Sequence, residues 1–88
     1  MAAVNQDTMT PQHMRAARAL LGWSVREMAK QVHVAEATIK RCETGQSVQQ
    51  ISRMTIFDAF KEHGVWMVDG DSLGVGLRNT SVGQNIAH

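Results

Sequence analysis

The 88-residue sequence predicts a mainly α-helical domain, a bundle of four to five helices followed by a short C-terminal β-hairpin. Three observations predict this class. Apolar residues recur with a helical period through residues 11–63, and capping residues or glycines stand at the ends of most periodic segments. After Gly64 the pattern becomes short and β-rich, with a turn signal between two runs. A chain of this length forms a single domain with a small core.

The first helix is predicted over residues 11–21. Thr10 is a favoured N-cap and Pro11 suits the first helical position. Gly22 suits the left-handed conformation that ends many helices. Residues 1–9 show no periodicity, so we expect a flexible N-terminal arm there. The apolar stripe of this helix consists of Met14, Ala17, Leu20 and Leu21.

Two short helices are predicted next, over residues 25–32 and 35–44. The first begins with a capping-box pattern, Ser24-Val25-Arg26-Glu27, and the chain breaks at His33. Small and apolar residues occupy the positions that would pack these helices steeply against the first: Met28, Ala29, Val32, Val34, Ile39 and Cys42. The outer face of the second short helix is then left mostly polar: Glu36, Ala37, Lys40, Arg41 and Thr44.

A fourth helix is predicted over residues 51–63, which completes a helical domain at residues 10–64. A strand at 65–68, a turn at 69–72 and a return strand at 74–78 would form the hairpin, and polar residues 79–88 would form a disordered tail. An open strand edge beside apolar side chains favours self-association. The predicted homodimer surface is therefore the hairpin, with Val65, Trp66, Met67 and Val68.

Charge is distributed unevenly although the formal net charge is only +1. Residues 10–53 hold seven Lys or Arg against three Asp or Glu, whereas residues 58–71 hold one Lys against four acidic residues. A positive half can attract a phosphate backbone, and solvated helix faces are the alternative explanation. The single cysteine, Cys42, excludes an intramolecular disulfide, suits a reducing cytoplasm and is expected to be buried. No apolar run has the length of a membrane span.

The sequence offers no support for an enzyme, a cofactor or a metal site. It contains no glycine-rich phosphate loop, no paired carboxylates in a recognisable setting, and no nucleophile with an evident base. Asp69-Gly70-Asp71 resembles the start of a calcium loop but lacks the later ligands. Metal-ligand spacing is absent among the histidines, which are His13, His33, His63 and His88.

Residues 10–45, TPQHMRAARALLGWSVREMAKQVHVAEATIKRCETG, resemble the helix-turn-helix of the phage repressor and Cro type, the xenobiotic-response-element family. The following EHGVWMVDGDSLGVGLR is similar to the ending of a bacterial subgroup with a hairpin after the fourth helix. The resemblance implies a lambda-repressor-like fold and a transcriptional regulator, with repression as the expected outcome. It also implies a double-stranded DNA operator, a homodimer, and a bacterial or phage protein at the cytoplasmic nucleoid.

The resemblance assigns roles by position. It implies that the recognition helix, residues 36–44, enters the major groove. Lys40 and Arg41 would donate to guanine, Ala37 would touch a thymine methyl, and Glu36 would accept from cytosine, with Thr38 as a further base-reading residue. Arg18 and Glu43 would form an ion pair between the first and third helices. The implied phosphate contacts are Arg15, the backbone N–H of Val25, Arg26, Lys30, Thr44 and Arg53.

Departures from the family pattern fall within the same motif. Val25 stands where the family often has Gln, and His33 where the turn usually has Gly. Ala35 replaces the usual Ser or Thr cap, and Cys42 replaces a leucine-like residue. These departures leave a second function open, in which the helix-turn-helix scaffold binds a protein, as an antiactivator or antitoxin, with weak or no DNA binding.

Overall fold

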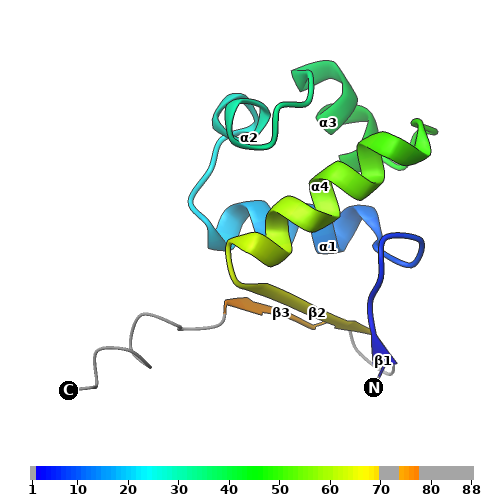
Figure 1. Ribbon diagram of the computed structural model, residues 1–88, viewed down its shortest axis with the longest axis vertical. Coiled ribbons are helices and arrows are strands. Elements are labelled where there is room, and N and C mark those ends of the chain that lie inside the picture. Colours follow the sequence, from blue (N-terminus) through cyan, green and yellow to red (C-terminus); the bar gives the residue numbers. More distant parts are fainter. Residues whose placement is uncertain (1, 70–73, 78–88) are drawn as a thin grey trace.

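The computed structural model describes residues 2–69 and 74–77 of the chain. Four helices and a three-stranded antiparallel sheet make up this part of the molecule (Figure 1). The mainly helical architecture and the C-terminal hairpin agree with the sequence prediction. The predicted turn at 69–72, beyond Asp69, and the predicted tail at 79–88 lie outside the described residues. In chain order the elements are β1 (Ala2–Ala3), α1 (Pro11–Leu20), α2 (Val25–Val32), α3 (Glu36–Glu43), α4 (Gln50–Glu62), β2 (Val65–Asp69) and β3 (Gly74–Leu77).

Side chains cap the first two helices. Thr10 accepts a hydrogen bond from the His13 N–H at 3.2 Å, and His13 accepts one from the Thr10 N–H, which completes a capping box. Ser24 caps α2 by accepting from the Glu27 N–H at 3.0 Å, but no return bond from Glu27 completes the box predicted there. Ala35 gives α3 no side-chain cap. Local signals therefore set the starts of α1 and α2, whereas packing holds α3.

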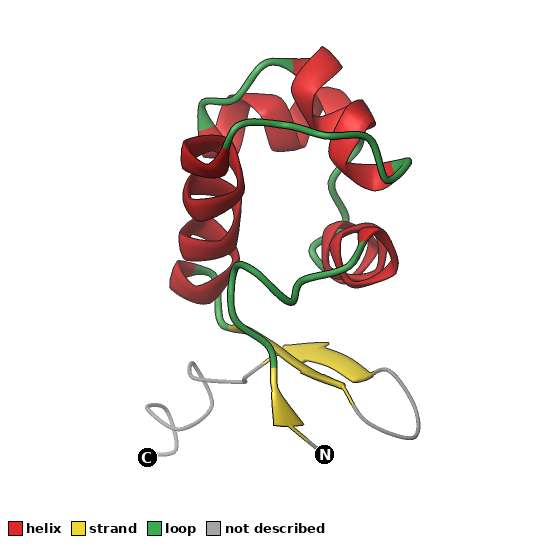
Figure 2. Ribbon diagram, turned by 90° about the vertical axis from the view of Figure 1, so that its right-hand side faces the viewer, coloured by secondary structure: helices red, strands yellow, loops and turns green. Residues whose placement is uncertain are grey.

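The core lies where the helices converge above the sheet (Figure 2). Each helix turns an apolar stripe inward, and α1 and α4 lie nearer the sheet than α2 and α3 (Figure 1). Leu20, predicted to belong to the apolar stripe of α1, is the last residue of that helix and is instead 44% exposed. The fully buried large side chains are His13, Met14, Met28, Ile39, Ile56 and Phe60.

The connection between α2 and α3 turns on a left-handed residue. His33 has φ 59° and ψ 42°, and it is the only non-glycine with positive φ among the described residues. The Val34 N–H donates back to the Ala29 carbonyl at 3.3 Å, which closes the end of α2. Three residues thus reverse the chain between two eight-residue helices.

The N-terminal segment is built into the fold, so the prediction of a flexible arm at 1–9 is wrong for residues 2–9. Ala2 and Ala3 pair with Asp69 and Val68, and the Val4 N–H donates to the Met67 carbonyl at 3.2 Å. Val4 and Met9 are buried. Two isolated apolar residues and a two-residue strand produce no periodicity, because their partners come from the far end of the chain.

The two faces of β2 have opposite surroundings. Val65 and Met67 are buried under the helices, whereas Trp66 is 42% exposed on the other face. The Trp66 ring lies over Gly76, where an added Cβ would come 2.1 Å from a ring carbon. The prediction of a dimer surface at residues 65–68 is therefore wrong for Val65 and Met67, which belong to the core of the protomer. Trp66 and the half-buried Val68 remain on the outer face.

Candidate nucleic-acid interface

The outer face of α3 is exposed at the end of the molecule opposite the sheet (Figure 1). Ile39, Cys42 and Glu43 are buried against the rest of the bundle. The helical period then turns the remaining side chains outward. No hydrogen bond or ion pair holds the Lys40 side chain among the described residues, so its ammonium group is free to meet a ligand. The predicted base-reading residues Glu36, Ala37, Lys40 and Arg41 are exposed, and Thr38 is half-buried.

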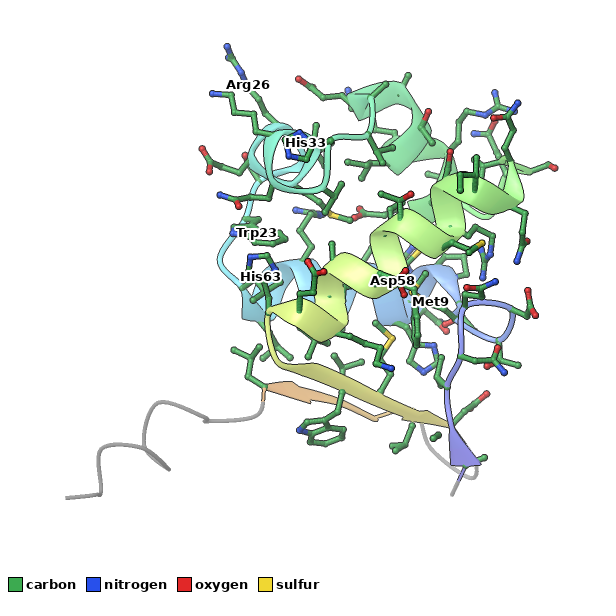
Figure 3. All side chains as sticks on the ribbon, in the orientation of Figure 1. Met9, Trp23, Arg26, His33, Asp58 and His63 are labelled. Atoms are coloured by element: carbon green, nitrogen blue, oxygen red, sulfur yellow. The ribbon has the colours of Figure 1, made fainter. Side chains whose placement is uncertain are left out.

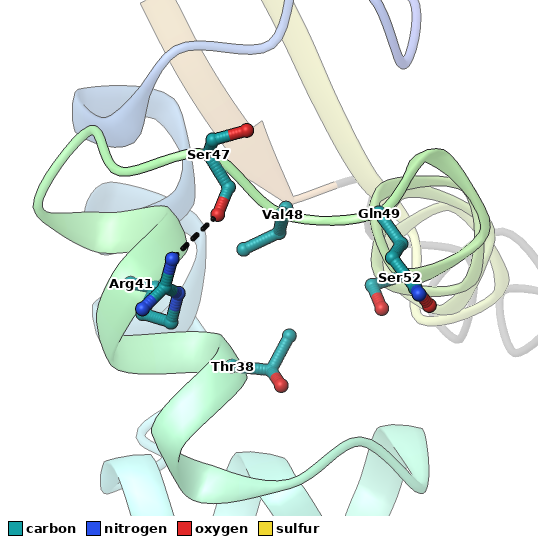
Figure 4. Close-up of a pocket in the computed structure, with 6 residues that line it drawn as sticks. All are labelled: Thr38, Arg41, Ser47, Val48, Gln49 and Ser52. Carbon is teal, nitrogen blue, oxygen red and sulfur yellow. Dashed lines mark hydrogen bonds between the residues drawn. The ribbon is translucent and has the colours of Figure 1, made fainter.

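Arg41 and Thr38 line a shallow groove between α3 and the start of α4 (Figure 4). Its volume is about 460 Å³, and Ser47, Val48, Gln49 and Ser52 complete the lining. The Arg41 Nη2 donates to the Ser47 carbonyl at 3.1 Å. This single bond leaves most of the five guanidinium donors unused, but it holds the side chain toward the connection to α4. Thr38 thus belongs with this groove as much as with the outer face.

The predicted ion pair between Arg18 and Glu43 is present. The Arg18 Nε donates to Glu43 Oε2 at 2.7 Å and Nη2 donates to Oε1 at 3.0 Å, a bidentate contact between α1 and α3. Arg18 also donates from Nη1 to the Trp23 carbonyl at 3.1 Å. The hydrogen bond to Glu43 raises the pKa of Arg18 above its ordinary value. This network holds α3 at a fixed angle on α1.

Helix α2 presents two unengaged cations, Arg26 in its first turn and Lys30 in its last. Arg26 and Lys30 are exposed, and neither makes a hydrogen bond or ion pair within the described part of the chain; Figure 3 shows Arg26 pointing away from the body of the molecule. Val25 is the first helical residue, so its backbone N–H has no acceptor within α2. The positive end of the helix dipole lies at the same place. Arg26 and the Val25 N–H therefore lie together at the N-terminal end of α2, and Lys30 is exposed one turn further along the helix.

Three other predicted phosphate contacts are engaged inside the protein. Arg53 donates to the carbonyls of Gln6 at 2.7 Å and Met9 at 2.6 Å, so it holds the N-terminal segment. Arg15 donates to the Glu43 carbonyl at the end of α3. The Thr44 hydroxyl donates to the Lys40 carbonyl at 2.8 Å. The phosphate role is wrong for Arg53, whose guanidinium is half-buried and already bonded; Arg15 and Thr44 stay exposed but serve as C-terminal partners of α3.

Sequence reasoning missed the role of His13. This side chain is fully buried, and its Nε2 donates to the Val68 carbonyl at 3.1 Å while Nδ1 accepts from the Thr10 N–H at 3.0 Å. It therefore joins the start of α1 to the hairpin. A Thr-x-x-His pattern is a signal for the cap, but no local signal identifies Val68 as the partner.

Trp23 and His63 meet at the C-terminal end of α4. The His63 Nδ1 donates to the Ala59 carbonyl at 2.8 Å, where a histidine favours the negative end of the helix dipole. The Trp23 and His63 rings meet edge to face, with centroids 4.9 Å apart (Figure 3).

As predicted, Cys42 is buried, and desolvation raises the pKa of its thiol.

Within the described ranges, no three His, Cys, Asp or Glu side chains gather closely enough to hold a metal ion. None of the helices in that part combines the length and the apolar content needed to cross a bilayer. Searches against protein-family models and against curated proteins gave no match to this chain.

Proposed function

We propose that this protein is a sequence-specific DNA-binding regulator of transcription, expected to act as a repressor. In this proposal α2 and α3 form a helix-turn-helix within a lambda-repressor-like fold, and α3 lies in the major groove. The observation that carries the proposal is that an exposed helix face and several unengaged cations lie at the same end of the molecule. The exposed outer face of α3 includes an unengaged Lys40, and α2 presents Arg26 beside its free N-terminus and Lys30 in its last turn.

The two sets of residues have different roles. Arg26, Lys30 and the Val25 N–H contact phosphates, which fixes the protein on the duplex without reading its sequence. Lys40 and Arg41 donate to guanine edges, Ala37 contacts a thymine methyl, and Glu36 accepts from cytosine. Because Arg18 and Glu43 clamp α3 onto α1, the reading face approaches DNA as part of a rigid body.

The salt dependence of DNA affinity tests the proposal. Each phosphate that the protein neutralises makes log K fall with log salt by a slope of about 0.9. We expect Arg26→Ala and Lys30→Ala each to reduce that slope by about 1, with equal losses of affinity on all sequences. Arg53→Ala is the matched control, since Arg53 is held by Gln6 and Met9 and should leave the slope unchanged. The proposal is contradicted if the wild-type protein is not retained at low salt on any DNA tested, its own promoter region included.

Two observations favour a second function: the Arg53 guanidinium is bonded to the N-terminal segment, and α3 has no side-chain cap at Ala35. A helix-turn-helix scaffold with so few free cations suits binding to a protein, as an antiactivator or antitoxin does. In that case the exposed face of α3 would meet a protein surface, and the affinity for DNA would be weak and insensitive to the Arg26→Ala change.

A further inference from the structure

A small apolar pocket lies between α4 and the part of the sheet where β1 meets β2. Its volume is about 200 Å³. Among the described residues that line it, none belongs to α2, α3 or β3, so the pocket is separate from the candidate nucleic-acid interface at the opposite end of the molecule (Figure 1). The lining includes Val4, Phe57, Phe60, Lys61, Val65 and Met67.

Lys61 is the one charged residue among those that line the pocket. Its ammonium group lies 5.7 Å from the centroid of the Phe57 ring, and it makes no hydrogen bond or ion pair within the described part of the chain. Asp58 and Glu62 lie on the same helix but do not line the pocket. The pocket therefore presents a positive charge without a carboxylate partner beside an apolar wall, and this charge attracts an anion.

The edge of β2 adds backbone donors to the pocket. The Val4 N–H donates to the Met67 carbonyl, so Met67 directs its backbone groups toward β1, and Val65, two residues away, directs its own to the same side. β1 pairs only with Val68 and Asp69, and neither the Val65 N–H nor the Met67 N–H donates to another described residue. Both residues are buried. Because buried N–H groups in folded proteins are nearly always paired, these two indicate an acceptor in the pocket.

We propose that this pocket binds a small carboxylic acid with an apolar body. The carboxylate accepts from the Lys61 ammonium group and from the strand-edge N–H of Val65, and the apolar body lies against Phe57 and Phe60. A neutral apolar molecule would leave these donors unpaired, which costs affinity. Pockets for drug-sized ligands measure about 300–1,000 Å³, so a volume of about 200 Å³ suits a smaller body, of roughly seven to ten non-hydrogen atoms.

A second apolar groove, between α1 and β3, provides an internal comparison. Ala16, Ala19, Leu20 and Val75 line it, and none of these residues is charged. A carboxylate should therefore prefer the pocket at Lys61, whereas an alcohol with the same hydrocarbon chain gains no ion pair at either place.

Nuclear magnetic resonance titration of the isotope-labelled full chain with hexanoate, whose size suits the pocket, tests the proposal. We expect a dissociation constant on the order of 1 mM, with the amide signals of Val65 and Met67 shifting together as hexanoate is added. The alcohol 1-hexanol should bind at least about 10-fold more weakly, because it lacks the charge that pairs with Lys61. Hexylamine should not bind in the pocket, since its own charge opposes that of Lys61.

Lys61→Met removes the charge and keeps an apolar stem, and because Lys61 is exposed the variant should fold. It should weaken hexanoate binding by about 10-fold or more and change the affinity for 1-hexanol by less than about 2-fold. Lys61→Arg should retain hexanoate binding. Lys30→Met is the matched control, because Lys30 is exposed on α2 and does not line the pocket.

Three results would overturn the proposal. The first is equal affinity of the wild type and Lys61→Met for hexanoate. The second is a set of shifts confined to Ala16 and Val75, in the groove between α1 and β3. The third is no shift of the Val65 and Met67 signals at hexanoate concentrations about 10-fold above the expected dissociation constant.

Discussion

At the scale of single residues, His33 carries backbone strain at the turn between α2 and α3. It joins α2 to α3 in the left-handed conformation, which costs an L-residue roughly 1–2 kcal/mol. Glycine adopts that conformation freely but loses more entropy on folding. The sequence predicted a break in the helical pattern at His33, and the structure confirms that α2 ends at Val32.

His33→Gly is expected to raise the free energy of unfolding by about 0.5 kcal/mol, and His33→Val to lower it by about 1–2 kcal/mol. Urea denaturation of the two variants measures both changes. Gly22 has φ +72° with open space around it, so Gly22→Ala is a control for the conformation alone and should destabilise by about 1 kcal/mol. Stabilisation by His33→Val would show that the turn does not hold the left-handed conformation.

Arg53 shows how a single residue can be misread from sequence. It was predicted to contact phosphate, and it holds the N-terminal segment through the Gln6 and Met9 carbonyls. A lone arginine on a polar helix face gives no sign of an acceptor more than forty positions earlier in the chain.

Replacing Arg53 should loosen residues 2–9 without altering the candidate DNA surface on α2 and α3. Arg53→Met loses charged hydrogen bonds worth about 2 kcal/mol in total, and limited proteolysis should then cleave within this segment. Arg26→Met, at an exposed and unengaged arginine, should change the unfolding free energy by less than about 0.5 kcal/mol. Equal resistance of the wild type and Arg53→Met to proteolysis at residues 2–9 would refute this role.

At the scale of elements, the contact between α1 and α3 is held by an ion pair with unequal exposure. The Glu43 side chain is 7% exposed and the Arg18 side chain 22% exposed. Removing one partner leaves a charge that water cannot fully solvate, whereas removing both leaves an apolar contact.

We therefore expect Arg18→Met to lower the free energy of unfolding by about 2–3 kcal/mol. This loss is at or below the low end of the range for breaking a buried ion pair, because the Arg18 side chain stays partly hydrated. The double variant Arg18→Met/Glu43→Leu should lose less than Arg18→Met alone. A double-mutant cycle from thermal or urea unfolding measures the coupling. Strictly additive losses would mean that the pair does not position α3.

Elements with strong local signals could be predicted, and elements that depend on distant partners could not. The starts of α1 and α2 follow from Thr10, Pro11 and Ser24. The run Val65–Val68 is apolar at every position, so it contains no alternation to show which side faces the core. The strand β1 has two alanines and exists only because β2 supplies its hydrogen bonds.

At the scale of the whole molecule, the sheet and the candidate DNA surface lie at opposite ends (Figure 1). Between the two ends the helices share a buried core, the Arg18–Glu43 ion pair joins α1 to α3, and His13 joins α1 to β2. The sequence indicated the polar face of α3 as the reading surface. It could not show that Arg53 is engaged internally while Arg26 and Lys30 are free, because that separation depends on tertiary contacts.

The most direct test of the central claim, that α3 reads DNA sequence, is a comparison of affinities for a site selected from a random DNA pool and for its scrambled version. The account predicts that the wild type prefers the selected site and that Lys40→Ala and Arg41→Ala each reduce the preference by about 1–3 kcal/mol. Lys30→Ala, by contrast, should weaken both affinities equally. No enriched sequence, or an unchanged preference in both the Lys40→Ala and Arg41→Ala variants, would contradict the claim.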